Sequence, residues 1–183
     1  MKQINSIILQ SGGLFNFDDP ENSHFTIEDI AHNLSHLCRF NGACDRFFSV
    51  AQHSVNCSRL LQTRQMLGHD GAEAFYGDMT TWLKKLCPDY RGHLARGEDV
   101  VADRLGVERG MSDDMKRVDY LALAVERKHL FKNCQLADSD DGFHHIKGLN
   151  PLDIMNAEQL MNMEPWTPRF AKLAFLERWD ELQ

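Results

Sequence analysis

The sequence lacks the features that mark membrane, secreted and disulfide-rich proteins. No apolar run approaches the ~20 residues that a bilayer-spanning helix needs, so no membrane partner is expected. Residues 1–17 carry one lysine and too short an apolar core for a signal peptide. The five cysteines are odd in number and include no CxxC pair. They are expected to be reduced thiols, which predicts a cytoplasmic protein.

Positive charge is scarce as well, and it is not gathered into one block. The chain has 20 Lys and Arg residues against 27 Asp and Glu residues, for a formal net charge of −7. A nucleic-acid-binding face needs clustered positive charge to neutralise phosphates, so no nucleic-acid partner is expected. A small phosphorylated substrate remains compatible with this charge, because metal ions and a few local cations could bind it.

What the sequence does contain is helical periodicity along nearly its whole length. At 183 residues, one domain covering 1–183 is expected. Apolar residues recur at helical spacing and no convincing period-2 run appears, which predicts an all-α fold. Residues 1–25 should be irregular, Arg39–Phe48 should form a loop, and 134–150 should form a polar loop. Helices are predicted after the capping residues Thr26, Ser49 and Ser112, and over 65–76, 81–86, 98–105, 151–161 and 168–182.

Two of the predicted helices should bring ionisable side chains together. His53 falls within the apolar arc of the helix that Ser49 caps, so it should face the core. On the helix predicted over 65–76, three ionisable residues share one arc of about 100°, namely His69, Asp70 and Glu73. The turn between the two helices is short, so these groups should lie near His53.

A metal ion would explain such a group of side chains. Two neighbouring buried carboxylates would take up protons unless a cation balanced them. Imidazole nitrogens and carboxylate oxygens together suit a first-row divalent metal. A further ligand is needed, and the helix after Ser112 offers Asp119 and Glu126, between which the pattern does not decide. The competing interpretations are a hydrogen-bonded core histidine at position 53 and a solvated polar face on the helix over 65–76. A Cys57–His53 nucleophile is disfavoured because no third residue is evident that would orient the pair.

Longer strings of residues resemble a known family. HDGAEAFYGDMTTWLK, residues 69–84, resembles the HDxxExxxGDxxxxxK pattern of the HD-domain metal-dependent phosphohydrolases, in their YfbR-like nucleotidase branch. SVAQHS, residues 49–54, resembles the helix that carries the first His of that branch. IEDIAHNLSHLCRFNG, residues 27–42, is similar to small phage and bacterial members, and the size and layout resemble those of the phage dATP triphosphohydrolases. The resemblance spans roughly residues 15–175 and implies a single HD-domain helical bundle.

The resemblance implies a role for each matching residue. The implied metal ligands are His53, His69, Asp70 and Asp119. Glu73 matches the catalytic acid or base of the family, and Asp78 matches a further acid that organises the site or a second metal.

Four more residues are implied to contact the substrate. Arg39 would touch its phosphate or sugar, and Phe40 would stack on its base. Lys84 and Lys116 would take phosphate oxygens.

The implied activity is hydrolysis of a deoxynucleoside triphosphate to a deoxynucleoside and inorganic triphosphate, with dATP as the expected substrate, in a phage with modified-purine DNA. The implied cofactor is a divalent ion (Mn, Co, Zn, Fe, Ni or Mg), with a second or third ion joining during turnover. The alternatives are a 5′-deoxynucleotidase acting on dNMPs, another phosphohydrolase or phosphodiesterase of the same type, and a non-catalytic nucleotide-binding module. Relatives form dimers or rings, so a homo-oligomer is expected.

Overall fold

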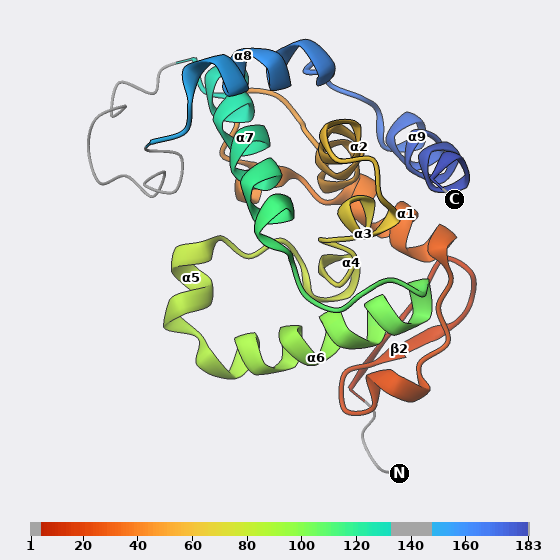
Figure 1. The fold of residues 1–183 in the computed structure, drawn as a ribbon. Coiled ribbons are helices and arrows are strands. Elements are labelled where there is room, and N and C mark those ends of the chain that lie inside the picture. The colour runs from red at the N-terminus through yellow and green to blue at the C-terminus, as the bar shows by residue number, and fades with distance from the viewer. Residues whose placement is uncertain (1–4, 133–147, 183) are drawn as a thin grey trace.

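The computed structural model describes residues 5–132 and 148–182, and nearly all of their regular structure is helical (Figure 1). This confirms the prediction of an all-α fold. The helices are α1 Ile27–His36, α2 Val50–Leu60, α3 Arg64–Leu67, α4 Glu73–Tyr76, α5 Thr81–Leu86, α6 Pro88–Leu105, α7 Asp113–Leu130, α8 Pro151–Leu160 and α9 Pro168–Glu181. Most of the loop predicted over 134–150 lies outside the described residues. Across the described ranges, none of the helices has both the length and the apolar character needed to cross a bilayer.

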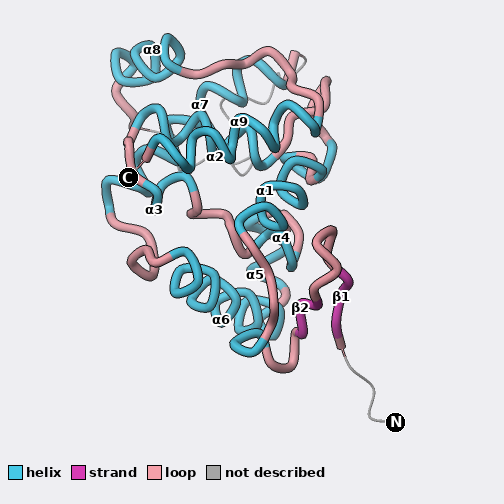
Figure 2. Tube along the Cα trace, turned by 90° about the vertical axis from the view of Figure 1, so that its right-hand side faces the viewer, coloured by secondary structure: helices cyan, strands magenta, loops and turns pink. Residues whose placement is uncertain are grey.

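Helix α2 stands at the centre of the molecule, with α7 on one side and α9 on the other (Figures 1 and 2). Every residue from Val50 to Ser58 is buried. The buried polar side chains of this helix nevertheless find partners. The Gln52 amide donates to the carbonyl oxygens of Asn162 and Glu164, at 3.0 and 2.8 Å, and its own oxygen accepts from the Trp166 N–H at 3.0 Å. A segment far along the chain therefore closes over α2.

Two clusters of apolar side chains pack on either side of α2. The first gathers side chains of α1, α9 and the amino-terminal segment, including the fully buried Phe15, Leu34 and Phe175. The second gathers around α7 and α8 and includes Met66 and Leu130. Because α2 contributes residues to both clusters, packing on two sides fixes its position.

The predicted helix over 65–76 is not continuous, which corrects the sequence analysis. It is split into α3 and α4 by a turn over residues 68–72. In this turn the Gly71 N–H donates to the Gly68 carbonyl at 2.9 Å. Glycine costs a helix interior roughly 0.5–1 kcal/mol relative to alanine, so two glycines three residues apart weaken a continuous helix. His69 and Asp70 are therefore presented by a turn. Gly77, with φ at 86°, ends α4 where the helix predicted over 65–76 was expected to end.

Two further segments differ from the expectation. Residues 1–25 were expected to be irregular, yet Ser6–Ile8 (β1) and Leu14–Asn16 (β2) form a small antiparallel pair. Three residues per strand are too few for an alternating pattern to be recognised. Helix α6 begins at Pro88, about ten residues before the predicted start. Its amino-terminal half is largely exposed and carries a weak apolar stripe, while Pro88 suits the first helical position.

Candidate metal centre

Two imidazole rings meet where α2 approaches the turn over residues 68–72. The Nε2 atoms of His53 and His69 are 3.3 Å apart. The Nδ1 atom of His53 lies 2.6 Å from the Glu126 carboxylate, and that of His69 lies 2.8 Å from the Met66 carbonyl. A carbonyl or an ionised carboxylate can only accept, so both Nδ1 atoms donate. With a neutral ring each Nε2 then carries a lone pair directed at the other, an arrangement that suits a shared cation.

Two carboxylates complete the group of donor atoms. Asp70 Oδ2 lies 3.5 Å from His53 Nε2 and 3.3 Å from His69 Nε2. Asp119 Oδ1 lies 3.2 and 3.9 Å from the same two atoms. Ligands that bind a tetrahedral ion at about 2.0–2.1 Å stand about 3.3 Å from one another. The structure thus brings the four predicted ligands together, and their spacing fits a divalent metal ion.

Cys57 lies against the same group. One donor atom from each of His53, Cys57, His69 and Asp119 lies within 4.8 Å of the others, so this buried set could also hold a metal ion. However, Cys57 Sγ is 3.5 Å from His53 Nε2 and 3.8 Å from Nδ1. Nearly equal distances put the sulfur beside the ring and not in front of the Nε2 lone pair. Asp70 is therefore the better placed fourth donor.

The surroundings keep the two candidate carboxylate ligands ionised. Burial by itself would raise the pKa of Asp70, but His69, His53 and Arg39 together lower it below its ordinary value. Burial opposes ionisation of Asp119 too. When the His53 ring is protonated at both nitrogens, its Nε2–H donates to Asp119, and this hydrogen bond is the largest of the effects that lower the pKa of Asp119. Both side chains are thus negative at neutral pH, as metal ligands must be.

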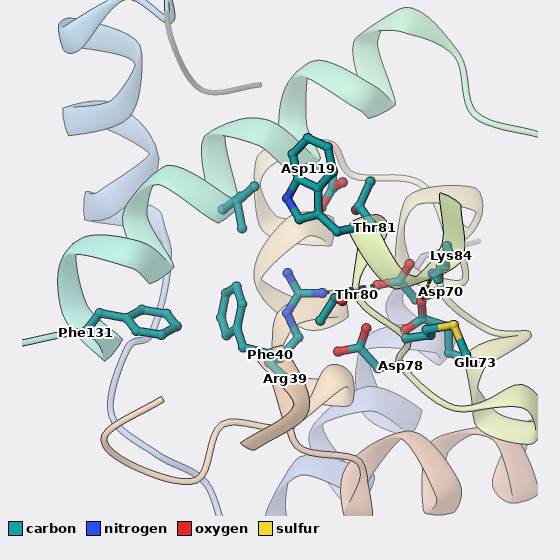
Figure 3. Close-up of a pocket in the computed structure, with 13 residues that line it drawn as sticks. Arg39, Phe40, Asp70, Glu73, Asp78, Thr80, Thr81, Lys84, Asp119 and Phe131 are labelled. Atoms are coloured by element: carbon teal, nitrogen blue, oxygen red, sulfur yellow. Dashed lines mark hydrogen bonds and ion pairs between the residues drawn. The ribbon is translucent and has the colours of Figure 1, made fainter. Parts of the chain in front are cut away.

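A pocket of about 400 Å³ opens in front of these carboxylates (Figure 3). Seven of the predicted site residues line it: Arg39, Phe40, Asp70, Glu73, Asp78, Lys84 and Asp119. Figure 3 shows the polar side chains of Asp70, Glu73 and Lys84 at one end and the rings of Phe40 and Phe131 at the other. The pocket therefore has a charged end and an aromatic end.

Glu73 and Lys84 form a partly shielded ion pair at the charged end. The Lys84 ammonium donates to Glu73 Oε1 at 2.8 Å, and only 8% of the Glu73 side chain is exposed. Glu73 Oε2 is buried and has no hydrogen-bond partner among the described residues. Burial, together with Asp70 and Asp78, raises the pKa of Glu73 well above its ordinary value, although Lys84 opposes this. Glu73 is thus suited to hold and release a proton.

Of the two remaining predicted site residues, Asp78 lies at the pocket and Lys116 does not. Asp78 reaches the pocket from the loop after α4, and burial raises the pKa of its carboxyl. Lys116 is not brought to the site. Its ammonium pairs with Asp113 Oδ1 at 3.1 Å, one turn earlier on α7, where both side chains are exposed.

Sequence reasoning did not place the large apolar side chains of Trp82, Leu123 and Phe131 at the site. Trp82 is 47% exposed and lines the pocket together with Leu123 and Phe131. Leu123 could have been found, because it lies one turn after Asp119 on the same helix. Glu126, weighed earlier as a metal ligand, is fully buried behind His53 instead.

Comparison with known proteins gives one informative relative. A scan against models of known protein families finds no match. The chain is 35% identical over 176 residues to YfdR, an uncharacterized protein of Escherichia coli (strain K12), and the match covers 94% of this chain and 92% of the relative. Identity at this level over nearly the whole of both chains shows common descent. This chain belongs to the family of YfdR.

Proposed function

We propose that this protein is an HD-domain phosphohydrolase that uses a divalent metal ion to cleave a nucleotide. The observation that carries the proposal is the convergence of His53, His69, Asp70 and Asp119 beside a pocket that also holds Arg39 and Lys84. When bound, the metal supplies Lewis acidity and lowers the pKa of water.

The charged end of the pocket would bind and process the phosphate. Arg39 and Lys84 line it and would offset the negative charge of phosphate oxygens. Glu73 is the general acid–base candidate, since it lies at the charged end of the pocket beside Asp70 and burial raises the pKa of its carboxyl. The aromatic end, formed by Phe40 and Phe131 with ring centroids 5.0 Å apart, would receive the base.

The family resemblance favours a deoxynucleoside triphosphate, and dATP in particular, as the substrate. In that reaction water attacks the α-phosphorus, and the products are deoxyadenosine and inorganic triphosphate. A phage would use this activity to deplete dATP in the host cytoplasm while a modified purine enters its DNA. The homo-oligomeric state, the cytoplasmic location and the single domain all stay predictions.

One observation favours a second candidate, a 5′-deoxynucleotidase acting on dNMPs. Among the described residues that line the pocket, two are cationic and four are acidic. Both cations are already paired, Arg39 with Glu126 and Lys84 with Glu73. Lys116, which would have served a longer phosphate chain, is held on the exposed surface. A monophosphate carries about two negative charges, which this small number of cations matches better than the charge of a triphosphate.

Product analysis separates the candidates. Metal-stripped protein would be incubated with each of the four dNTPs and dNMPs plus Mn, Co, Zn or Mg, and deoxynucleoside, triphosphate and orthophosphate would be resolved by chromatography. Deoxyadenosine with stoichiometric triphosphate supports the triphosphohydrolase, whereas nucleoside and orthophosphate from dNMPs alone support the nucleotidase. Either activity should be lost in Asp70→Ala and Glu73→Ala and kept in Lys116→Ala, the matched surface control. No turnover with any of these metals and nucleotides would contradict the proposal.

A further inference from the structure

Glu126 joins a candidate metal ligand, His53, to a candidate phosphate-binding cation, Arg39. It lies two turns after Asp119 on α7, and its side chain is completely buried. Its Oε1 accepts from His53 Nδ1 at 2.6 Å, and its Oε2 accepts from Arg39 Nη2 at 2.9 Å. One carboxylate thus contacts a candidate metal ligand with one oxygen and a candidate phosphate-binding cation with the other.

We infer that Glu126 is a positioning residue that couples metal binding to phosphate binding, an inference that rests on the proposed function of the site. An acceptor at His53 Nδ1 keeps the proton on that nitrogen, so the Nε2 lone pair faces the other metal-binding groups. The same carboxylate holds the Arg39 guanidinium, whose Nη1 lies 3.8 Å from Asp70 Oδ2, at the wall of the pocket.

The burial of this chain of three groups supports a positioning role. His53 and Glu126 have no exposed side-chain surface, and the side chain of Arg39 is 11% exposed. A buried carboxylate is destabilising unless it is paired and hydrogen-bonded, and both conditions are met here. Since neither end can relax into water, a change at Glu126 must be felt at both His53 and Arg39.

Replacing Glu126 with glutamine keeps the shape but removes one acceptor. If the amide oxygen faces Arg39, the amide NH₂ faces His53 Nδ1. This contact favours the His53 tautomer that carries its proton on Nε2, and a protonated Nε2 cannot bind a metal ion. If the amide is turned round, its NH₂ faces the Arg39 guanidinium, and the two donors repel. Either orientation therefore disrupts the contact with His53 or the contact with Arg39.

The test measures zinc affinity by competition with a chromophoric chelator, without any turnover. Glu126→Gln should lower zinc affinity by about 10–100-fold, the range for loss of an acceptor behind a liganding histidine. Asp114→Asn, an exposed carboxylate on the same helix, should leave it unchanged. Glu126→Asp keeps the charge but is too short to reach both partners, so an intermediate zinc affinity is expected. This variant allows the same measurement if Glu126→Gln does not fold.

A second measurement tests the coupling. Binding of inorganic phosphate to the zinc-loaded protein would be followed calorimetrically in Arg39→Gln, in Glu126→Gln and in the double variant. If Glu126 acts by holding Arg39, the losses in phosphate affinity should be clearly non-additive. A merely structural role would lower stability without this non-additivity.

The outcomes separate this inference from the proposed function. Wild-type zinc affinity in folded Glu126→Gln or Glu126→Asp, or additive phosphate losses, would overturn the positioning role even in an active enzyme. Lowered zinc affinity and non-additive losses in a protein that hydrolyses no nucleotide would support the positioning role and leave the proposed function contradicted.

Discussion

At the scale of single residues, the geometry favours Asp70 over Cys57 as the fourth donor around the candidate metal. Asp70 lies within 3.5 Å of both Nε2 atoms, whereas the sulfur of Cys57 lies beside one ring. We therefore expect Asp70→Ala to lose bound metal and Cys57→Ala to keep about one ion per chain. Metal content after dialysis, measured by mass spectrometry, checks both variants.

Cobalt loading gives the matching spectroscopic control. The wild-type protein should show the visible bands of a nitrogen and oxygen site and no thiolate charge-transfer band in the near ultraviolet. A charge-transfer band that disappears in Cys57→Ala would instead assign the fourth position to sulfur.

At the scale of elements, the contact between α4 and α6 depends on a missing side chain. A Cβ atom at Gly97 would lie 2.2 Å from the Tyr76 ring, so Gly97→Ala should destabilise the protein by about 1–3 kcal/mol. Gly92 lies on the same helix with open space around it, and there alanine should stabilise by about 0.5–1 kcal/mol. Urea unfolding of the two variants provides the measurement, and equal effects would contradict the packing argument.

The junction between the strand pair and α1 should make the free energy of unfolding fall at acid pH. Buried Asp29 accepts hydrogen bonds from Ser11, at 2.8 and 3.0 Å, and from Thr26 at 3.1 Å. Burial would raise the pKa of Asp29, but these hydrogen bonds hold it below its ordinary value of 3.8. The stabilisation is therefore present above about pH 4. It is lost as pH falls through the lower pKa of the folded state.

The variant Asp29→Asn should cost about 1–3 kcal/mol near neutral pH, because charged acceptors form the stronger hydrogen bonds. The difference from wild type should shrink as pH drops below 4. Glu28→Gln, the exposed neighbour in the same helical turn, is the control. A difference that stays constant from pH 7 to pH 3 would show that ionisation of Asp29 is not involved.

The sequence could predict features that depend on local signals, but not those that depend on tertiary contacts. Thr26, Ser49 and Ser112 marked helix starts correctly because capping depends on a hydroxyl and a backbone N–H three residues away. Asp119 and Glu126 could not be told apart because they lie seven residues apart, on nearly the same face of α7. Only the packing of α7 against α2 directs the first to the pocket and the second behind His53.

At the scale of the whole molecule, metal binding should stabilise the folded chain. The unfolded chain has no preformed site, so an ion at 100 times its dissociation constant adds about 2.7 kcal/mol. For a chain of this length that corresponds to an increase in Tm of about 5–10 °C. Thermal unfolding with zinc and with a chelator measures the shift, which Asp70→Ala should abolish. An unchanged Tm in the wild-type protein would contradict metal binding at this site.

The Gln52 amide has a consequence for how the protein is made. Its backbone partners lie 110 to 114 residues downstream. Helix α2, which carries His53, therefore lacks these tertiary hydrogen bonds until the last part of the chain has been synthesised. Chains fold from the amino terminus as they are synthesised, at roughly 5–20 residues per second. All four candidate ligands therefore leave the ribosome before the segment that closes over α2. We therefore expect metal capture to be a late step in the maturation of the chain: a nascent chain halted before residue 160 would carry every candidate ligand without a finished site.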